Sequence, residues 1–475
     1  MGKTVLVVGG GPAGSTAAAL LARAGLRVRL FEREAFPRYH IGESLAPSCR
    51  AVLELSGAGP AVADHGFQIK RGGLFRWGAE DWGVDWSGNF GTQVYSWQVD
   101  RGEFDRLLLD NARAQGVEVI EGAHVRQVLF DGPRPTGLVW TRQGDNQQMT
   151  AQGDFLVDAS GRAGLLSTRY HRDRTPHEVF RNVAIWGYWQ GGETLPGSPE
   201  GGLNAISSPD GWYWVIPLAG KRLSVGFVTH RDIFQTRRRD YPTLEELLLA
   251  FVRESDTVSK LVSMGRFQAP ARVEQDYSYV ADRFCGPGHV VLGDAACFLD
   301  PLLSTGTHLA MFSALMGAAA VTATLDGTVP EDEALGFFDH SYRRAYDRFL
   351  RLVSLMYQQY RGKETYFWQA QRLVKDGERY HAPVGAFARI ISGLSDLQDT
   401  GYTPGWAGPD NVAAAPDPAP PDPAAPGPAA QNPAAQDPAA QGHDAGAAVR
   451  SIFDPATGLR LVTDPRLGLA RTDPA

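Results

Sequence analysis

The chain has 475 residues, 43% of them hydrophobic and 21% charged, so it can bury a large core and is too long for one ordinary domain. Its net charge of −7 and the absence of any long lysine or arginine run exclude an electrostatic footprint for nucleic acid. The spacing of Cys49, Cys285 and Cys297 fits neither a disulfide framework nor a metal site, which indicates reduced thiols in a cytoplasmic protein.

The N-terminus predicts a βαβ unit. The apolar run Thr4 to Val8 leads straight into a glycine turn, which favours a strand over a secretion signal. A helix is predicted from Ser15 to Ala24, capped by Gly25, and a second, parallel strand from Leu26 to Glu32. No stretch of the chain approaches the ~18 apolar residues of a membrane span, so no membrane association is expected.

The next elements are a helix and two strands. Leucines at helical spacing predict a helix from Phe104 to Gln115, and the apolar residues after Gly116 predict one strand from Val117 to Val125. A further strand is predicted from about Phe155 to Asp158.

A change of pattern marks a second lobe. Between Val183 and Val228 tryptophan and tyrosine are frequent in alternating strands, which predicts an antiparallel sheet with one face towards a cavity. Strand-then-turn returns at Val290 to Asp294, and His308 to Leu325 predicts a helix of small residues. The first lobe therefore resumes late in the sequence.

The C-terminal part divides into three segments. Glu333 to Ser395 is predicted to be helical, with most of its aromatic rings in the core: Tyr342, Tyr346, Phe349, Tyr357 and Tyr360. Residues 404–447 are dominated by proline and alanine, with Pro-Ala-Ala-Gln repeated from Pro428 to Gln441, so they are predicted to be disordered. The few apolar residues from Val449 to Ala475 predict a loose tail.

A dinucleotide site follows the first strand. Gly9, Gly11 and Gly14 form a Gly-x-Gly-x-x-Gly turn that places backbone amides and a helix N-terminus at a pyrophosphate. Glu32, at the end of the second strand, is expected to accept a hydrogen bond from a ribose hydroxyl. Strand, motif, helix, strand and acid within ~30 residues make this a specific signal rather than a tight turn.

Two later segments indicate FAD rather than NAD. Asp158-Ala159-Ser160-Gly161-Arg162 and Gly293-Asp294-Ala295-Ala296 resemble the second and third FAD motifs of the aromatic-hydroxylase superfamily. That resemblance implies that Asp294 holds the ribityl or ribose portion. Arg101 resembles the arginine that members place near the flavin, although a surface arginine at the start of a helix explains it equally well.

Three further segments, over about residues 1–400, resemble flavin-dependent halogenases, particularly those that act on phenolic or pyrrolic groups. They are Glu32-Arg33-x-x-Phe36-Pro37-Arg38-x-His40-Ile41-Gly42-Glu43-Ser44-Leu45, the Trp-x-Trp-x-Ile-Pro of Trp212 to Pro217, and the loop Phe298 to Gly306. The cofactor-binding positions expected on this basis are Gly9, Gly11, Ala13, Gly14, Glu32, Arg33, Arg38, Ile41, Gly42, Ser44, Arg101, Val125, Asp294, Asp300, Pro301 and Gly306.

The resemblance implies a reaction and its residues. Trp212 and Trp214 would keep an aromatic substrate from the flavin, while backbone amides of Thr305 and Gly306 would hold chloride. Hypochlorous acid made from reduced FAD, O2 and chloride would then travel to Lys70, in Gly-Phe-x-x-Lys-x-Gly-Gly, which would act as an ammonium donor or as a neutral amine that forms a chloramine. A lysine taken by itself is more often a solvated surface residue.

One departure from the family pattern narrows the class of substrate expected. Tryptophan halogenases carry a glutamate where this chain has Leu303, so an unactivated indole is disfavoured and an electron-rich phenol or pyrrole is expected. Asp300 lies where some relatives bond FAD covalently, but a turn aspartate before Pro301 is the favoured interpretation. The expected partners are a separate flavin reductase and a small aromatic substrate, either free or tethered to a carrier protein.

The fold class predicted is α/β, with a Rossmann-type FAD-binding domain, an inserted antiparallel sheet that faces the substrate, and a helical C-terminal region. The boundaries expected are 1–175 and 276–330 for the FAD-binding domain, 176–275 for the sheet, 331–403 for the helices, 404–447 for the linker and 448–475 for the tail. Two alternatives to a halogenase stay open. One is a single-component aromatic hydroxylase or related flavin reductase, and the other is a flavoprotein scaffold without turnover.

Overall fold

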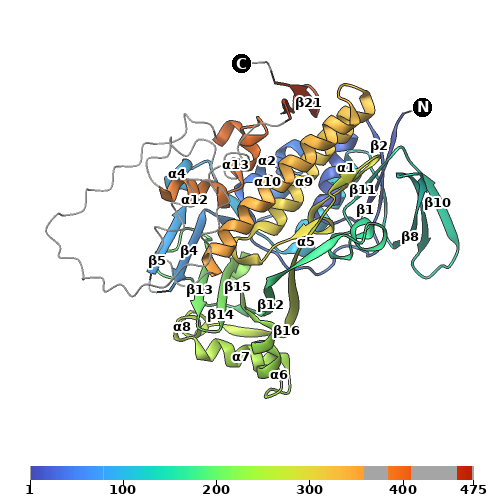
Figure 1. The fold of residues 1–475 in the computed structure, drawn as a ribbon. Coiled ribbons are helices and arrows are strands. Elements are labelled where there is room, and N and C mark those ends of the chain that lie inside the picture. Colours follow the sequence, from blue (N-terminus) through green and yellow to red (C-terminus); the bar gives the residue numbers. More distant parts are fainter. Residues whose placement is uncertain (1, 79, 358–382, 408–456, 473–475) are drawn as a thin grey trace, which may run out of the picture.

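The computed structural model describes residues 2–78, 80–357, 383–407 and 457–472 (Figure 1). Its first sheet has six strands in the order β17-β18-β11-β1-β2-β7. Their bounds are β1 Thr4–Val8, β2 Arg27–Phe31, β7 Glu118–Ile120, β11 Phe155–Asp158, β17 Cys285–Gly286 and β18 His289–Val291. All neighbours pair in parallel except β17 with β18. The helix α1 (Pro12–Arg23) joins β1 to β2, which confirms the predicted βαβ unit and the α/β class.

The single strand expected from Val117 to Val125 is wrong. The chain turns at Gly122, which has φ +69°, so β7 ends at Ile120 and a new strand, β8 (Ala123–Asp131), begins. β8 pairs with β9 (Arg134–Arg142), and β9 pairs with β10 (Gln148–Gln152), in a separate three-stranded antiparallel sheet.

The predicted antiparallel sheet is present but larger than expected. It has eight strands in the order β19-β16-β12-β15-β14-β13-β4-β5. Their bounds are β4 Gly72–Trp77, β5 Glu80–Asp85, β12 Arg174–Gln190, β13 Leu203–Ser208, β14 Gly211–Leu218, β15 Arg222–His230, β16 Arg266–Ala281 and β19 Cys297–Phe298. β4 and β5 come from the N-terminal segment, and β4 joins β13 in parallel. The segment that carries Lys70 is thereby brought beside the tryptophan-rich strands.

The two faces of this sheet differ because successive side chains point to opposite sides. Trp212 and Trp214 face the core shared with the first sheet, whereas Tyr213 and Val215 pack in a second core. The helices α6 (Arg231–Arg238), α7 (Leu244–Glu254) and α8 (Asp256–Val262) lie along that second face, below the sheet in Figure 1.

Two long helices run through the middle of the molecule (Figure 1): α9 (Thr305–Asp326) and α10 (Glu331–Tyr357). α9 packs against both α1 and α10. By length and composition, α9 is the one described helix apolar enough to cross a membrane, so the expectation that no stretch approaches a span is wrong. Within the fold, 89% of its most apolar window is buried.

The helical C-terminal region packs onto this centre. Tyr342, Tyr346 and Phe349 of α10 are buried as predicted, whereas Tyr360 lies outside the described residues. After the gap, α12 (Pro383–Ile391) and α13 (Leu394–Asp399) contact α10. Short helices complete the lobe: α2 (Pro47–Ser56), α3 (Gly59–Asp64), α4 (Trp86–Phe90) and α5 (Arg101–Ala114).

The loose tail predicted for the C-terminus is wrong for residues 457–472. β20 (Leu459–Val462) and β21 (Gly468–Arg471) form a hairpin, and β21 packs on α9 (Figure 1). Its apolar side chains are buried, namely Leu459, Leu461, Leu467 and Leu469. Arg466 pairs with Asp326, and Arg471 pairs with Glu333. Residues 408–447 of the predicted linker lie outside the described residues.

Candidate active site

The glycine turn after β1 has no room for side chains. A Cβ on Gly9, which has φ +103°, would lie 2.1 Å from the carbonyl oxygen of Ala159, and one on Gly14 would lie 1.9 Å from that of Gly9. No side chain caps the N-terminus of α1. The guanidinium of Arg38 comes within 3.4 Å of where a Cβ on Gly11 would stand. Amides, helix terminus and a nearby cation fit the pyrophosphate of FAD.

Glu32 is buried and engaged with the backbone of this turn. Its Oε2 accepts a hydrogen bond from the amide of Gly10 at 2.6 Å, and its Oε1 accepts one from the amide of Glu34 at 2.8 Å. The carboxylate of Glu32, expected to accept a ribose hydroxyl, therefore joins the glycine turn at Gly10 to the segment that follows β2 at Glu34. Arg33, by contrast, is exposed and pairs with Glu34.

Two other predicted cofactor positions lie on neighbouring elements. Ala13 on α1 is buried, and its Cβ is 3.2 Å from where a Cβ on Gly293 would stand. The Gly-x-Gly-x-x-Gly turn and the segment Gly293 to Ala296 are therefore in contact. Val125 is half-buried on β8.

Arg101 begins α5 and is buried, which excludes the surface interpretation. Its Nε and Nη2 donate to the two carboxylate oxygens of Asp105 at 2.8 and 3.1 Å, and its Nη1 donates to the carbonyls of Ile41 at 2.7 Å and Gly42 at 3.3 Å. Burial lowers the pKa of Arg101, but the opposite charge of Asp105 outweighs it and the pKa is raised. Arg101 thus fixes the segment at Ile41 and Gly42, both predicted to bind FAD.

Asp294 lies in the turn that follows β18. Burial raises the pKa of its carboxyl, and the nearby Arg162, Arg101 and Arg174 oppose that shift. Its carbonyl oxygen accepts hydrogen bonds from Tyr279 at 2.6 Å and from Arg174 at 3.0 Å. The charges of Asp294 and Arg101 are therefore close enough to influence each other.

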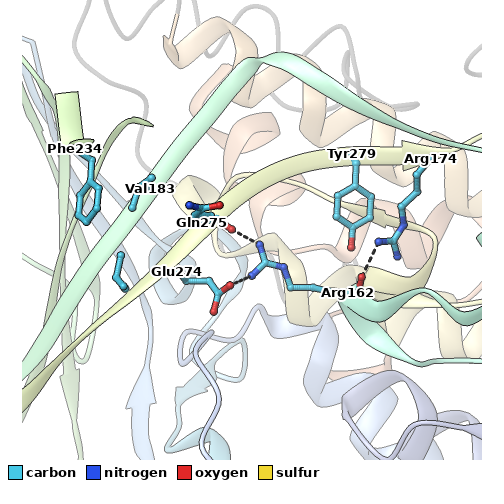
Figure 2. Close-up of a pocket in the computed structure, with 8 residues that line it drawn as sticks. Arg162, Arg174, Val183, Phe234, Glu274, Gln275 and Tyr279 are labelled. Carbon is cyan, nitrogen blue, oxygen red and sulfur yellow. Dashed lines mark hydrogen bonds and ion pairs between the residues drawn. The ribbon is translucent and has the colours of Figure 1, made fainter. Parts of the chain in front are cut away.

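A cavity of about 640 Å³ lies beside this region, and Figure 2 shows its lining. It is lined by Arg162, Arg174, Val183, Phe234, Val273, Glu274, Gln275 and Tyr279. The guanidinium of Arg162 reaches across to β16, where it donates to Glu274 at 2.5 Å and to the carbonyl of Gln275. Arg162 belongs to the second FAD motif, so the cavity lies between the FAD fold and the antiparallel sheet.

Lys70 ends β3 (Gln68–Lys70), which pairs with β6 (Ser96–Gln98). Only 4% of Lys70 is exposed, so the surface interpretation is excluded. Its Nζ donates to the Oγ of Ser44 at 2.7 Å and to the carbonyl of Leu45 at 2.9 Å, and lies 4.9 Å from the ring centroid of Trp86. Burial lowers the pKa of Lys70 to about 7, because the ammonium loses water without gaining a carboxylate.

The tryptophans of β14 form a wall with a third ring. Trp212 and Trp214 have ring centroids 6.1 Å apart, and Trp186 of β12 lies 6.1 Å from Trp214. The indole of Trp214 donates to Ser224 at 3.1 Å. A Cβ on Gly226 would lie 2.2 Å from the Trp214 ring, so the missing side chain at Gly226 gives this ring its place.

Asp300 behaves as the favoured turn aspartate. Its Oδ1 accepts the amide of Leu302 at 3.0 Å, and its Oδ2 accepts Asn182 at 3.0 Å and the hydroxyl of Tyr357 at 2.8 Å. The same hydroxyl accepts the indole of Trp212 at 2.7 Å. Tyr357 therefore connects the loop Phe298 to Gly306 to the tryptophan wall.

The predicted chloride position is the N-terminus of α9. No side chain caps this terminus, and the preceding Ser304 has φ 57°. The Oγ1 of Thr305 is buried and has no hydrogen-bond partner among the described residues, and nothing lies within 4 Å of where a Cβ on Gly306 would stand. Pro301 is half-buried and Leu303 is buried in the preceding turn. An uncapped helix terminus with open space suits a small anion.

Two buried groups were not predicted as parts of the site. Glu43 lies in the segment Glu32 to Leu45, is buried, and accepts a hydrogen bond from the hydroxyl of Tyr188 at 2.7 Å. His308 lies 2.7 Å from Ser48 and 2.8 Å from Asp396, and this Ser-His-Asp arrangement is fully buried between helices. Glu43 could have been found, because it lies inside the segment that resembles the halogenases. The Ser48, His308 and Asp396 group could not, because its members are up to 348 positions apart and form no local sequence pattern.

No cluster of metal-ligating side chains occurs within the described ranges.

Comparisons with known proteins show to which family the chain is similar. The family model described as "Tryptophan halogenase" matches residues 4–94 and 87–394. A relative from Chondromyces crocatus, named tryptophan 2-halogenase, is 42% identical over 407 residues, which cover 83% of this chain and 76% of the relative. The flavin-dependent halogenase armH3 of Armillaria mellea is 35% identical, covering 83% and 81%. The solved structure of the myxobacterial chondrochloren halogenase CndH, an FAD-dependent halogenase, has a TM-score of 0.71 at 35% identity, covering 83% and 91%.

Proposed function

This chain belongs to the tryptophan halogenase family and is a flavin-dependent halogenase, an enzyme that uses reduced FAD, O2 and a halide. From that premise we propose that it chlorinates an electron-rich phenol or pyrrole, and that Lys70 delivers the chlorine. The observation that carries the proposal is the burial of Lys70, with its amine held by Ser44 and Leu45. A solvated lysine would not need two interior acceptors.

The FAD-binding residues are proposed to be those of the glycine turn together with Arg38, Arg101 and Asp294. Bound reduced FAD and O2 supply the oxidising equivalent that converts chloride to hypochlorous acid. The amides of Thr305 and Gly306 would hold the chloride, because the N-terminus of α9 is uncapped. The wall of Trp212 and Trp214 would keep the aromatic substrate away from the cofactor.

Lys70 is proposed to act as a neutral amine. The lowered pKa leaves a substantial fraction of the amine unprotonated near neutral pH. The neutral nitrogen would displace hydroxide from hypochlorous acid and lose a proton, giving a chloramine and water. The aromatic ring would then take the chlorine from nitrogen and lose a proton, while the nitrogen takes up a proton, so that the amine is restored.

The proposed substrate class follows from Leu303. A buried leucine at this place offers no carboxylate to accept the proton from an inactive ring, so the ring must be activated by its own phenolic oxygen or pyrrolic nitrogen. The relative from Chondromyces crocatus carries tryptophan in its name, which makes tryptophan a necessary arm of the test. Flavin-dependent halogenases generally need a separate flavin reductase, and we propose the same partner here.

The test is product mass spectrometry. The protein is incubated with a flavin reductase, FAD, NADH, O2 and chloride, and offered a phenol, a pyrrole and tryptophan, with the phenol and pyrrole also supplied on a carrier protein. We expect a mass increase of one chlorine for hydrogen on a phenol or pyrrole, and loss of that product in Lys70→Met with FAD still bound. Lys260→Met, at an exposed position of α8, is the matched control.

Hydroxylated product with no halogen would contradict the proposed reaction. Chlorination of tryptophan but of no phenol or pyrrole would contradict the proposed substrate class. A Lys70→Met protein that chlorinates at the parental rate would contradict the role given to Lys70.

A further inference from the structure

Gly42, Glu43 and Ser44, three consecutive residues in the segment after β2, contact three different parts of the site. Gly42 lies against Arg101, and Ser44 accepts the amine of Lys70 at 2.7 Å. Between them, Glu43 accepts the hydroxyl of Tyr188, on the sheet face that carries the tryptophans. The backbone of Glu43 is fixed, because its carbonyl accepts the amide of Val99 at 2.7 Å. Glu43 is 3% exposed, so its carboxyl is held inside the protein at a defined place.

A chain of hydroxyls leads from this carboxyl to the surface. Tyr188 donates to Oε1 of Glu43 at 2.7 Å, the hydroxyls of Tyr188 and Tyr39 are 2.9 Å apart, and the indole of Trp186 donates to Tyr39 at 2.7 Å. Each phenol has one proton, so while Tyr188 donates to the carboxylate, Tyr39 must donate to Tyr188. The oxygen of Tyr39 keeps one lone pair for water, and Tyr39 is 45% exposed. The chain therefore ends in solvent.

The second carboxyl oxygen of Glu43 is buried, and Glu43 lies close to Ser224, the residue that accepts the indole of Trp214. This oxygen, Oε2, has no hydrogen bond of normal geometry among the described residues, although the hydroxyl of Ser224 is close enough to lower the pKa of Glu43. A buried carboxylate oxygen without a partner is costly, so this oxygen calls for a proton or a ligand.

The charged and titratable groups around Glu43 come from several elements. Burial raises its pKa to about 7; Ser224 and Tyr188 oppose the shift by hydrogen bonding, Asp100 adds to it, and Arg222 opposes it. Arg101 also interacts with Glu43. The balance leaves a carboxyl that changes its protonation near neutral pH, which is the property that efficient acid–base catalysis requires.

We propose that Glu43 accepts the proton that the aromatic ring loses as its carbon–chlorine bond forms, and that Tyr188 and Tyr39 pass this proton to solvent. The inference rests on the proposed function. Within the loop Phe298 to Gly306, Leu303 offers no carboxylate, and both carboxylate oxygens of Asp300 already accept hydrogen bonds.

The step balances in atoms and charge. The ring attacks the chlorine of the Lys70 chloramine, the nitrogen–chlorine bond breaks, and its electron pair stays on nitrogen. The nitrogen takes a proton from water to restore the amine, and the hydroxide left behind is neutralised by the proton that the ring releases to solvent. The ring's carbon–hydrogen bond then breaks, its electron pair returns to the ring, and Oε2 of Glu43 takes the proton. The protonated carboxyl then turns its O–H towards Tyr188, and the two phenol hydroxyls reverse their hydrogen bonds, so that Tyr188 donates to Tyr39 and Tyr39 donates to water. A concerted shift of one proton along each bond regenerates the carboxylate without forming a free tyrosinate, and restores the resting direction of the chain. That route is needed because burial raises the pKa of both tyrosines.

The first test uses the oxidised holoenzyme without turnover. Infrared difference spectra of the parent minus Glu43→Gln should show one protonated carboxyl band that disappears with a midpoint near pH 7. Tyr188→Phe removes a donor that favours the carboxylate, so the midpoint should move upward. Tyr170→Phe, remote from this chain, should leave it in place. The proposal is overturned if no such band titrates, or if Tyr188→Phe leaves the midpoint unchanged.

The second test measures turnover. Glu43→Gln should lower kcat for chlorination about 100-fold, the usual range for a lost general base, with unchanged affinity for FAD and unchanged KM for chloride. Glu43→Asp should restore part of the rate, and Tyr39→Phe should slow the reaction and shift its pH profile. If Glu43→Gln does not retain FAD, the two tyrosine variants decide the question by the same readouts. Chlorination at the parental rate in Glu43→Gln would overturn the role given to Glu43 and leave the proposed function intact. If the parent protein itself chlorinates no substrate, the proposed function fails, and the infrared titration still tests Glu43 independently.

Discussion

The amine of Lys70 donates to the hydroxyl of Ser44 across 2.7 Å, and this bond joins β3 to the segment that follows β2. Both acceptors of the amine, Ser44 and the carbonyl of Leu45, are uncharged. Nothing in this pair offsets the cost of burying an ammonium, which is why burial dominates the pKa of Lys70. The arrangement is costly for stability at low pH and useful for a neutral nitrogen nucleophile.

The buried amine should make stability depend on pH. The pKa of Lys70 falls from 10.5 to about 7 on folding, so between these values the unfolded chain binds more protons than the folded chain, and the free energy of unfolding rises with pH. From about pH 7 to about pH 9 the expected gain is about 2 kcal/mol relative to Lys70→Met, in which the group is absent. Urea unfolding at both pH values measures it.

Lys260→Met serves as the control for that measurement, because an exposed lysine should show no such difference from the parent. If the parent and Lys70→Met change stability in parallel over this pH interval, the lysine is not buried as an amine.

Much of the fold was predictable because its signals are local. A Cβ on Gly14 would collide with the carbonyl oxygen of Gly9 inside the same turn, so this part of the signal is local, and the βαβ unit can be read from ~30 residues. The alternating tryptophans likewise predict one sheet with two faces. The extra strands β4 and β5 were not predictable, because their place depends on pairing with β13, more than a hundred residues later.

The candidate site residues could be predicted where they lie in a sequence motif and are also buried in the structure. Lys70 and Arg101 each had a surface alternative that only burial excludes. Glu43 escaped notice because the partner of its side chain, Tyr188, lies on a distant strand. The hairpin from Leu459 to Arg471 was not predicted for a different reason. A few leucines after a polar segment do not show by themselves that the segment is ordered, because their burial depends on contact with the apolar helix α9.

The buried group around Asp396 is expected to lock the C-terminal helices onto α9. Asp396 accepts His308 at 2.8 Å and pairs with Arg348, which also pairs with Asp399 at 2.6 Å. Asp396→Asn should lower the free energy of unfolding by about 3 kcal/mol, because it leaves a buried arginine partly unpaired. The chloride KM should rise as well, since His308 lies one turn into the helix that begins at Thr305.

Asp326→Asn is the matched control, because its pair with Arg466 is partly exposed and should contribute less than about 1 kcal/mol. Urea unfolding of both variants gives the comparison. Equal small losses would show that the buried pair does not hold α10 and α13 in place.

A stop after residue 456 should destabilise the protein without stopping chlorination. It removes four buried leucines and uncovers part of α9, which is expected to cost about 3 kcal/mol after the entropy gained by freeing the hairpin is subtracted. Differential scanning calorimetry should show a lower melting temperature, and kcat should equal that of the full chain. A large loss of kcat at a temperature where both proteins are folded would instead place the hairpin in the catalytic cycle.

Gly226→Ala should disturb the tryptophan wall directly. The new methyl group would stand 2.2 Å from the ring of Trp214, so the ring must turn away, and its hydrogen bond to Ser224 is lost with it. Overpacking of this kind costs about 1–3 kcal/mol, and the turned ring should reopen a path between cofactor and substrate. We expect slower chlorination, some hydroxylated product and altered tryptophan fluorescence. Gly336→Ala on α10, where nothing lies within 4 Å of the added methyl group, should leave all three measurements at parental values. Parental chlorination without hydroxylation in Gly226→Ala would mean that the position of Trp214 does not govern access to the cofactor.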